Sequence, residues 1–247
     1  MAVDHALLES VQAGGRPVLR LYRWDPACLS LGRNQHARGL YDEARLRETG
    51  IDIVRRPTGG LAVLHHLELT YCVLAPVSVL GGPRAAYRAI NGALVDGLRR
   101  LGVPAGLAAG GAGRDPRRAA AEPCFHAPAD GEVVAGGRKL VGSAQRCEGA
   151  TLLQHGSILL AGSQSTVLGL LRGGPAPAGP EQVAGSVTME EILGAVPGWD
   201  EMVAALTSGF GRTLGTRLAP DALNHEEAVR AEALEATYRD AAWTWRR

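Results

Sequence analysis

Residues 131–160 carry the pattern that most constrains the fold, a series of short strands divided by glycine turns. The segment reads GEVVAGGRKLVGSAQRCEGATLLQHGSILL, in which apolar positions recur and the pairs Gly136-Gly137 and Glu148-Gly149 favour tight turns. We therefore predict three strands there. Further strands are predicted over 17–24, 28–33, 51–56 and 61–76, the last as one long strand or a strand pair. The strand over 28–33 is expected to pair with the strand over 17–24 across a turn at Asp25-Pro26.

Helical periodicity appears on both sides of this strand-rich region. It predicts helices over 2–12, 40–48, 84–101, 188–194, 199–214 and 221–240. The stretches 102–121 and 173–185 are rich in Gly, Ala and Pro and are expected to be mostly loop. Strands gathered in the middle of a chain, with helices around them, favour an α+β fold over a regular βαβ alternation. We expect a central mixed or antiparallel sheet flanked by helices. A length of 247 residues fits one large domain or two small ones.

The overall charge and hydropathy exclude several classes of protein. A net charge of +1 provides no field that would attract nucleic acid or an anionic membrane. No apolar run approaches the roughly 20 residues of a membrane span. The first ten residues, MAVDHALLES, lack the basic and then apolar build of a signal peptide. A cytoplasmic protein with no nucleic-acid or membrane partner is expected.

Four cysteines are present, and their spacing argues against a common metal site or disulfide bonds between them. None forms a CxxC pair, so neither a zinc site nor a disulfide framework is predicted. Cys28 and Cys72 lie in strand-like runs and are expected to be buried, whereas Cys147 beside a turn could be buried or exposed. Cys124 lies in PCFHAP, between two prolines, and loops of this kind run over the surface. We expect Cys124 to be the most accessible thiol of the four.

Lys139 is the only lysine among 26 basic residues. It lies in GRKLVGSAQR, where a regular strand would place Lys139, Val141 and Ser143 on one face. The small residues Gly142, Ser143 and Ala144 would leave room for a ligand against the backbone. A lysine ammonium is a compact charge whose pKa can be shifted, which suits a functional role. The alternatives are an exposed strand lysine, or one lysine that survived a general drift to arginine.

Two further segments carry residues that suit a binding site. RRPTGG ends a predicted strand with Arg55 and Arg56, which suit a phosphate or carboxylate, and Gly59 and Gly60 would let a ligand approach the backbone. A surface turn with two solvated arginines would look similar. His155 in QHGSILL is eligible as a base because its ordinary pKa is near 6.5. A structural histidine is the alternative reading.

Together these segments resemble the lipoate–protein ligase and octanoyltransferase family, part of the biotin/lipoate ligase superfamily. RRPTGGLAVLHHLELTY is similar to the family's arginine–glycine motif, and GRKLVGSAQR with LLQHGSILL is similar to its lysine motif and the strand that follows. PCFHAP resembles the cysteine segment of the octanoyltransferase branch of many Gram-positive bacteria. The resemblance is dense over 2–160. It implies one biotin/lipoate ligase-like catalytic domain over 1–247, without a C-terminal accessory domain.

The resemblance also implies a reaction. Cys124 would attack the thioester of octanoyl-acyl carrier protein, and a lysine of a lipoyl domain, such as the glycine cleavage H protein, would then take the octanoyl group as an amide. Lys139 would polarise the acyl carbonyl and favour the thiolate. No metal, ATP or other cofactor is expected. The residues implied to line or shape the pocket are Arg55, Arg56, Gly59, Gly60, His65, Gly142, Ser143, Ala144 and His155.

The chain departs from the family pattern at three places. His66 stands where the family usually has an aspartate, and Leu61 occupies the third position of the glycine run. The chain also begins at the segment that an extra strand normally precedes, so either the start codon is misassigned or an edge strand is missing.

Three other functions remain open at this point. An ATP-dependent lipoate ligase would use the same motifs with ATP and Mg²⁺ and would not need Cys124. An amidotransferase would move octanoyl or lipoyl groups between carrier proteins and would use the same cysteine. A domain that only binds acylated carriers would need neither Cys124 nor Lys139.

Overall fold

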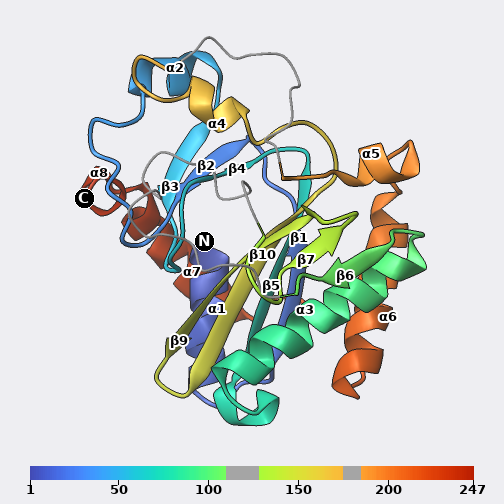
Figure 1. The fold of residues 1–247 in the computed structure, drawn as a ribbon. Coiled ribbons are helices and arrows are strands. Elements are labelled where there is room, and N and C mark those ends of the chain that lie inside the picture. The colour runs from blue at the N-terminus through green and yellow to red at the C-terminus, as the bar shows by residue number, and fades with distance from the viewer. Residues whose placement is uncertain (110–127, 175–184) are drawn as a thin grey trace.

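The computed structural model describes residues 1–109, 128–174 and 185–247, and it contains three sheets (Figure 1). The largest is an antiparallel sheet in the order β1-β5-β10-β9. Its strands are β1 (Val18–Tyr22), β5 (Glu68–Pro76), β10 (Thr151–Leu159) and β9 (Val141–Glu148). The expected α+β class is confirmed.

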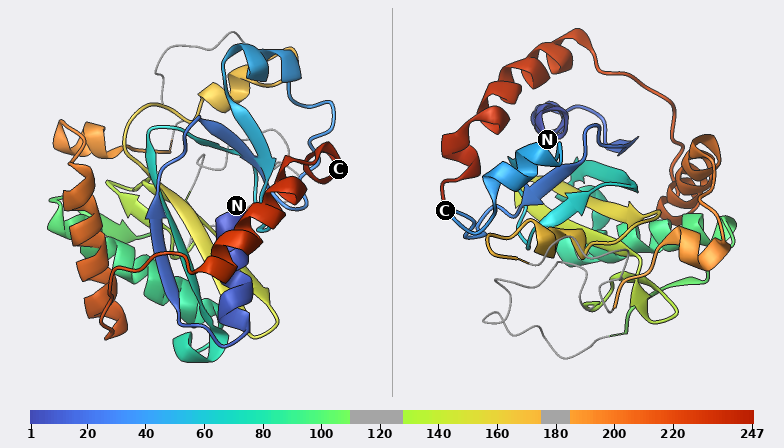
Figure 2. Two further views of the ribbon diagram at one scale, coloured as in Figure 1. Left: turned by 180° about the vertical axis from the view of Figure 1, so that it is seen from behind. Right: turned by 90° about the horizontal axis from the view of Figure 1, so that it is seen from above.

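Helices cover both faces of the large sheet (Figures 1 and 2). On one face, α3 (Pro83–Arg100) packs beside α6 (Trp199–Leu214); on the other, α1 (Ala2–Gln12) packs beside α7 (His225–Arg239). In the central strand β5, Leu69, Tyr71 and Val73 pack in the cluster that contains α3. Cys72 and Leu74 pack in the cluster that contains α1. Because successive side chains point to opposite faces, burial on both faces explains the unbroken apolar run of this strand.

Two smaller sheets stand beside the large one. The first has the order β3-β2-β4, and the second has the order β6-β7-β8. The first contains β2 (Cys28–Leu31), β3 (Asp52–Arg55) and β4 (Val63–His65), and the second contains β6 (Ala105–Leu107), β7 (Val133–Ala135) and β8 (Arg138–Lys139). The shorter helices are α2 (Glu43–Glu48), α4 (Thr166–Gly169), α5 (Met189–Leu193), α8 (Ala241–Thr244) and the 3₁₀ turn η1 (Val77–Leu80). The pairing of β2 with β3 is parallel, so this sheet is mixed.

The expected pairing of the first two strands is wrong. β1 pairs with β5 in the large sheet, whereas β2 is the central strand between β3 and β4. All four residues of β2 are buried, including Ser30. A strand with every residue buried needs partners and cover on all sides, which a two-stranded hairpin cannot give.

Two strand predictions are also refined. The segment 61–76 is a strand pair whose members lie in different sheets, and the break falls at Leu67, whose φ is +50°. The segment 131–160 forms four strands rather than three, because β8 ends before Leu140 and β9 begins after it, in a different sheet. The turns at Gly136-Gly137 and at Gly149 are present, and these glycines have positive φ. In the described residues, no helix has the length and apolar character needed to cross a membrane.

Candidate active site

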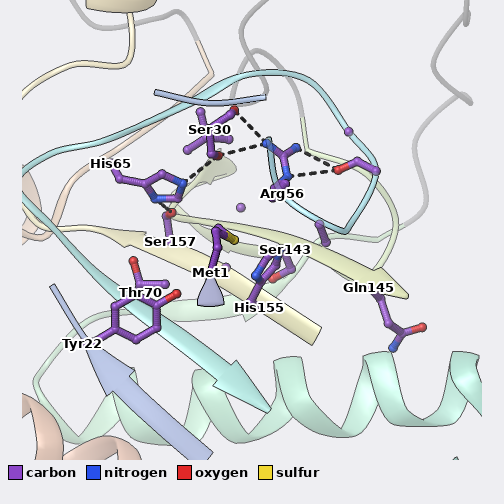
Figure 3. A pocket seen from close by; sticks show the side chains of 16 residues that line it. Met1, Tyr22, Ser30, Arg56, His65, Thr70, Ser143, Gln145, His155 and Ser157 are labelled. Atoms are coloured by element: carbon purple, nitrogen blue, oxygen red, sulfur yellow. Dashed lines mark hydrogen bonds between the residues drawn. The ribbon is translucent and has the colours of Figure 1, made fainter. Parts of the chain in front are cut away.

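A cavity of about 280 Å³ lies between the large sheet and the sheet formed by β2, β3 and β4 (Figure 3). Its lining comprises Met1, Tyr22, Ser30, Arg56, Gly59, Gly60, Val63, His65, Thr70, Gly142, Ser143, Ala144, Gln145, His155, Gly156 and Ser157. Gly59 and Gly60 are exposed and the segment 142–145 is half-buried, whereas Ser30, His65 and His155 are buried. The mouth therefore lies between the 59–60 turn and β9.

Arg56 organises the turn that borders the mouth. Its guanidinium donates to the carbonyl oxygens of Gly59 and Leu61 and, through Nη1, to the carbonyl and the hydroxyl of Ser30. The distances run from 2.7 to 3.1 Å. A Cβ atom on Gly32 would lie 1.8 Å from the carbonyl oxygen of Gly60, so the 59–60 turn approaches this backbone too closely for any side chain. The arginine–glycine segment therefore builds the wall of the cavity.

His65 is held at the inner side of the cavity by four neighbours, of which Ser30 and Ser157 are drawn in Figure 3. Its Nδ1 lies 2.7 Å from Oε1 of Glu68 and 3.2 Å from the hydroxyl of Ser157. Its Nε2 lies 2.7 Å from the hydroxyl of Ser30. The ring stacks on Trp24 with a centroid separation of 4.5 Å. Because a carboxylate only accepts hydrogen bonds, we assign the proton to Nδ1, which leaves Nε2 to accept from Ser30.

His155 faces the cavity from the centre of β10. Its Nε2 lies 2.6 Å from the hydroxyl of Thr58. Burial lowers the pKa of His155 to about 3, and the charge of Asp4 opposes this shift only in part. The ring is therefore neutral near pH 7. The next residue, Gly156, allows β10 to lie close to β9, since a Cβ atom there would be 2.4 Å from the carbonyl oxygen of Gly142.

Eight of the residues expected at the site line this one cavity. They are Arg56, Gly59, Gly60, His65, Gly142, Ser143, Ala144 and His155. His66, at the departure from the family motif, is exposed at the break between β4 and β5 and does not line it.

Arg55 and Lys139 lie elsewhere. Arg55 is fully buried, and its guanidinium donates to backbone carbonyls of Gly32, Gln35 and Thr244. It thus fastens the C-terminal segment rather than lining the cavity, because neighbouring residues of a strand point to opposite sides.

The predicted strand that joins Lys139 to Ser143 is wrong. Lys139 ends β8, Ser143 lies in β9, and the two strands belong to different sheets. Lys139 is 1% exposed and its Nζ lies 2.7 Å from Oε1 of Glu132. Neither residue of this ion pair lines the cavity.

The three cysteines that the structure describes differ in their exposure to solvent. Cys28 and Cys72 are buried, as expected, and Cys147 is exposed. Burial raises the pKa of the Cys28 thiol to about 12 and that of Cys72 well above its ordinary value, with nearby acidic groups adding to the effect. Cys124 lies outside the described residues.

The sequence reasoning missed several cavity residues, chiefly Ser30, Thr70 and Ser157. Ser157 could have been found, because it lies two residues after His155 and shares its strand face. Ser30 had no such signal, since its strand was assigned to the wrong partner. In the described residues, no group of three or more His, Cys, Asp or Glu side chains could hold a metal ion.

Comparison with known proteins identifies the family. The model of the lipoyl protein ligase A/B catalytic domain matches residues 1–211. The chain belongs to the lipoyl protein ligase A/B family. Its relatives in this family include "Octanoyltransferase LipM" of Symbiobacterium thermophilum, which is 40% identical over all of this chain and 93% of the relative. The protein of the same name from Kyrpidia tusciae is also 40% identical, over all of this chain and 94% of the relative.

Solved structures of lipoate ligases share this fold. Lipoate-protein ligase A bound with ATP superimposes with a TM-score of 0.80 and 26% identity, covering 99% of this chain and 92% of that one. A putative lipoate protein ligase from T. acidophilum with bound lipoic acid gives a TM-score of 0.77 and 26% identity, covering 100% of this chain and 92% of that one. The lipoyl protein ligase A/B fold expected from the motifs is thus confirmed.

Proposed function

We propose that the protein is an octanoyltransferase of lipoate biosynthesis. It would take the octanoyl group from octanoyl-acyl carrier protein and place it on a lysine of a lipoyl domain, such as the glycine cleavage H protein. The observation that carries this proposal is full-length similarity, at 40% identity, to relatives named octanoyltransferase. The cavity supports it: about 280 Å³ is near the lower end of the roughly 300–1,000 Å³ of ligand pockets and suits a short acyl chain.

Cys124 is the proposed nucleophile, and the other cysteines support this choice. Cys28 and Cys72 are buried and their raised pKa values suppress the reactive thiolate. Cys147 is exposed, but its neighbours Arg146 and Glu148 pair with each other, and none of the three lines the cavity. None of the three cysteines that the structure describes lines the cavity, so the motif segment makes Cys124 the candidate among the four thiols.

The proposed chemistry has two balanced steps. The Cys124 thiolate attacks the carbonyl carbon of the octanoyl thioester, the bond to the carrier sulfur breaks, and the carrier thiolate takes up the proton that Cys124 released. The acceptor amine then attacks the same carbon, a C–N bond forms, and the proton of the amine goes to the departing sulfur of Cys124. Since a thioester is exchanged for a thioester and then for an amide, neither ATP nor a metal is needed.

The other residues that the motifs single out, both in the cavity and away from it, would have supporting roles. Lys139 would polarise the carbonyl, for which its ammonium would have to turn from Glu132. Gly59, Gly60 and the segment 142–144 would admit the acyl chain, and Arg56 would hold the 59–60 turn in place. The ring of His65 and the neutral ring of His155 would shape the chain's binding surface. Arg55 would act only through the backbone that it binds.

Transfer in the absence of ATP tests this function. We expect octanoyl-acyl carrier protein and a lipoyl domain to give octanoylated lipoyl domain, measured by intact mass. Transfer that requires ATP and free octanoate would instead make the protein a ligase. Transfer from octanoylated H protein to a second lipoyl domain, without transfer from acyl carrier protein, would make it an amidotransferase.

A further inference from the structure

Three arginines lie behind the lining residues, in contact with the turn that borders the mouth or with one another, and we call Arg33, Arg146 and Arg246 the arginine rim. The backbone N–H of Arg33 donates to the carbonyl of Thr58 at 2.8 Å. Nη1 of Arg146 lies 3.5 Å from the carbonyl oxygen of Pro57. Both residues thus hold the 57–60 turn, whose two glycines border the mouth.

The third member of the rim is fixed to the first. Nη2 of Arg246 donates to the carbonyl of Arg33 at 2.6 Å, and the guanidinium lies 4.0 Å from the ring centroid of Trp243. The three arginines are half-buried, so each keeps part of its side chain in contact with solvent. Stacking on Trp243 and the hydrogen bond to the Arg33 carbonyl hold the guanidinium of Arg246 without neutralising its charge.

The rim has little negative charge to balance it. Arg146 pairs with Glu148 at 2.6 Å, but within the described ranges no carboxylate lies within ion-pair distance of Arg33 or Arg246. Nε of Arg246 is buried and has no hydrogen-bond acceptor there. Burial, with the guanidinium groups of Arg33, Arg247 and Arg146, lowers the pKa of Arg246, as expected for cations held near one another. Repulsion between these like charges costs free energy, and an anionic partner bound beside them would reduce that cost.

We propose that the arginine rim is the docking surface for the acidic face of the acceptor protein, around its target lysine. This rests on the proposed octanoyl transfer. We choose the acceptor rather than the donor because the two reacting groups extend to different lengths from their proteins. A lysine side chain is only a four-carbon stem, so the surface that carries it must sit directly on the mouth. A donor thioester hangs from a long prosthetic arm, which can keep its carrier away from the mouth. The rim attracts acidic side chains around the lysine and, by repelling the ammonium, favours the free amine that attacks the thioester.

The two half-reactions distinguish the possible partners. Octanoylated enzyme is isolated, and the second-order rate constant for octanoyl loss to a lipoyl domain is measured for wild type, Arg33→Gln, Arg33→Lys and Arg33→Gln/Arg246→Gln. Arg212→Gln, on α6, is the matched control. We expect the double variant to lose about tenfold in the acceptor half-reaction at low salt, because charge steering operates on this scale. Arg33→Lys should retain most of the rate, and the loss should shrink as salt rises.

The donor half-reaction, formation of octanoylated enzyme from octanoyl-acyl carrier protein, should change less than twofold in every rim variant. A loss confined to this half-reaction would assign the rim to the donor and overturn the proposal. Unchanged rates in both half-reactions would also overturn it.

Binding of the lipoyl domain, followed by titration calorimetry, tests the rim without catalysis. The double variant should bind it about tenfold more weakly than Arg212→Gln, a scale set by charge steering, and equal affinities would contradict the docking surface. If wild type forms no octanoylated enzyme but the rim variants lose binding, the proposed function fails and the docking surface stands. Thermal unfolding of each variant identifies any that fails to fold.

Discussion

Nδ1 of His65 lies 2.7 Å from Oε1 of Glu68, and this carboxylate oxygen also accepts from the hydroxyl of Thr70. The other oxygen, Oε2, is buried without a hydrogen-bond partner in the described part of the chain. A carboxylate buried at such a position holds the neighbouring imidazole in one tautomer and one orientation. Glu68 does not line the cavity, so it would act through His65 as a positioning residue.

Glu68→Gln should therefore weaken octanoyl transfer through His65. A hydrogen bond to a charged group contributes about 1.5–3 kcal/mol, so we expect a loss of at least about tenfold in kcat/KM. The cycle of Glu68→Gln, His65→Gln and the double variant is the test, with steady-state transfer as the readout. If Glu68 acts through His65, the double variant is no slower than His65→Gln. Losses that multiply would show that the two residues act separately.

His155 makes the stability of the fold dependent on pH. Its folded pKa of about 3 lies below the ordinary value of 6.5, so the unfolded chain binds more protons between these values. The contribution is complete above about pH 6.5 and is lost as pH falls towards 3, by about 1.4 kcal/mol per pH unit. Urea unfolding at pH 7.5 and pH 5 should show a smaller loss of stability in His155→Gln than in wild type. His66→Gln, at an exposed histidine, should behave as wild type; equal pH dependence in all three would contradict the assignment.

Gly32 fixes the position of the 59–60 turn. A methyl group at residue 32 would lie 1.8 Å from the carbonyl oxygen of Gly60, so Gly32→Ala must displace that turn. We expect a loss of about 1–3 kcal/mol, as for other overpacked sites, and impaired octanoyl transfer. Gly106→Ala is the control, since a methyl group there has no atom within 4 Å, and its unfolding free energy should change by less than about 1 kcal/mol. Similar stabilities for the two variants would contradict the close approach.

The ion pair of Lys139 and Glu132 allows structure and catalysis to be separated. Removing one member of a buried pair costs about 3–5 kcal/mol because the other charge is left without compensation. Lys139→Met and Glu132→Gln should each lower stability in urea unfolding. The double variant should regain much of that stability but, lacking the proposed electrophilic lysine, should not regain octanoyl transfer. Recovery of transfer together with stability would show that Lys139 is only structural.

The longer helices and most strands could be predicted because their signals are local, whereas the one-turn helices α4 and α8 were missed. The periodicity of residues 2–12 gives the bounds of α1 as found, and glycine pairs mark the turns of the central segment. Strand pairing is different, because it depends on contacts between segments far apart in sequence. The sequence around Asp25-Pro26 suited a hairpin, but the buried strand β2 needs a neighbour on each side and finds them in β3 and β4.

The sequence could predict which segments form the candidate site. It could not predict which side chains of those segments point into the cavity. Arg55 and Arg56 are adjacent, yet only Arg56 lines the cavity; His65 lines it and His66 is exposed. These alternations depend on where each strand begins, which a motif does not fix. The partner of Lys139 was missed because Glu132 lies seven residues earlier, across a hairpin whose register only the fold defines.

The thiol that carries the octanoyl group is the most direct test of this account. Protein incubated with octanoyl-acyl carrier protein, without ATP, is measured by intact mass before and after hydroxylamine, and the modified cysteine is mapped by peptide mass. We predict one hydroxylamine-sensitive octanoyl group on Cys124, retained in Cys147→Ser and absent as a thioester in Cys124→Ser. A labile thioester that persists in Cys124→Ser and disappears in Cys147→Ser would contradict it.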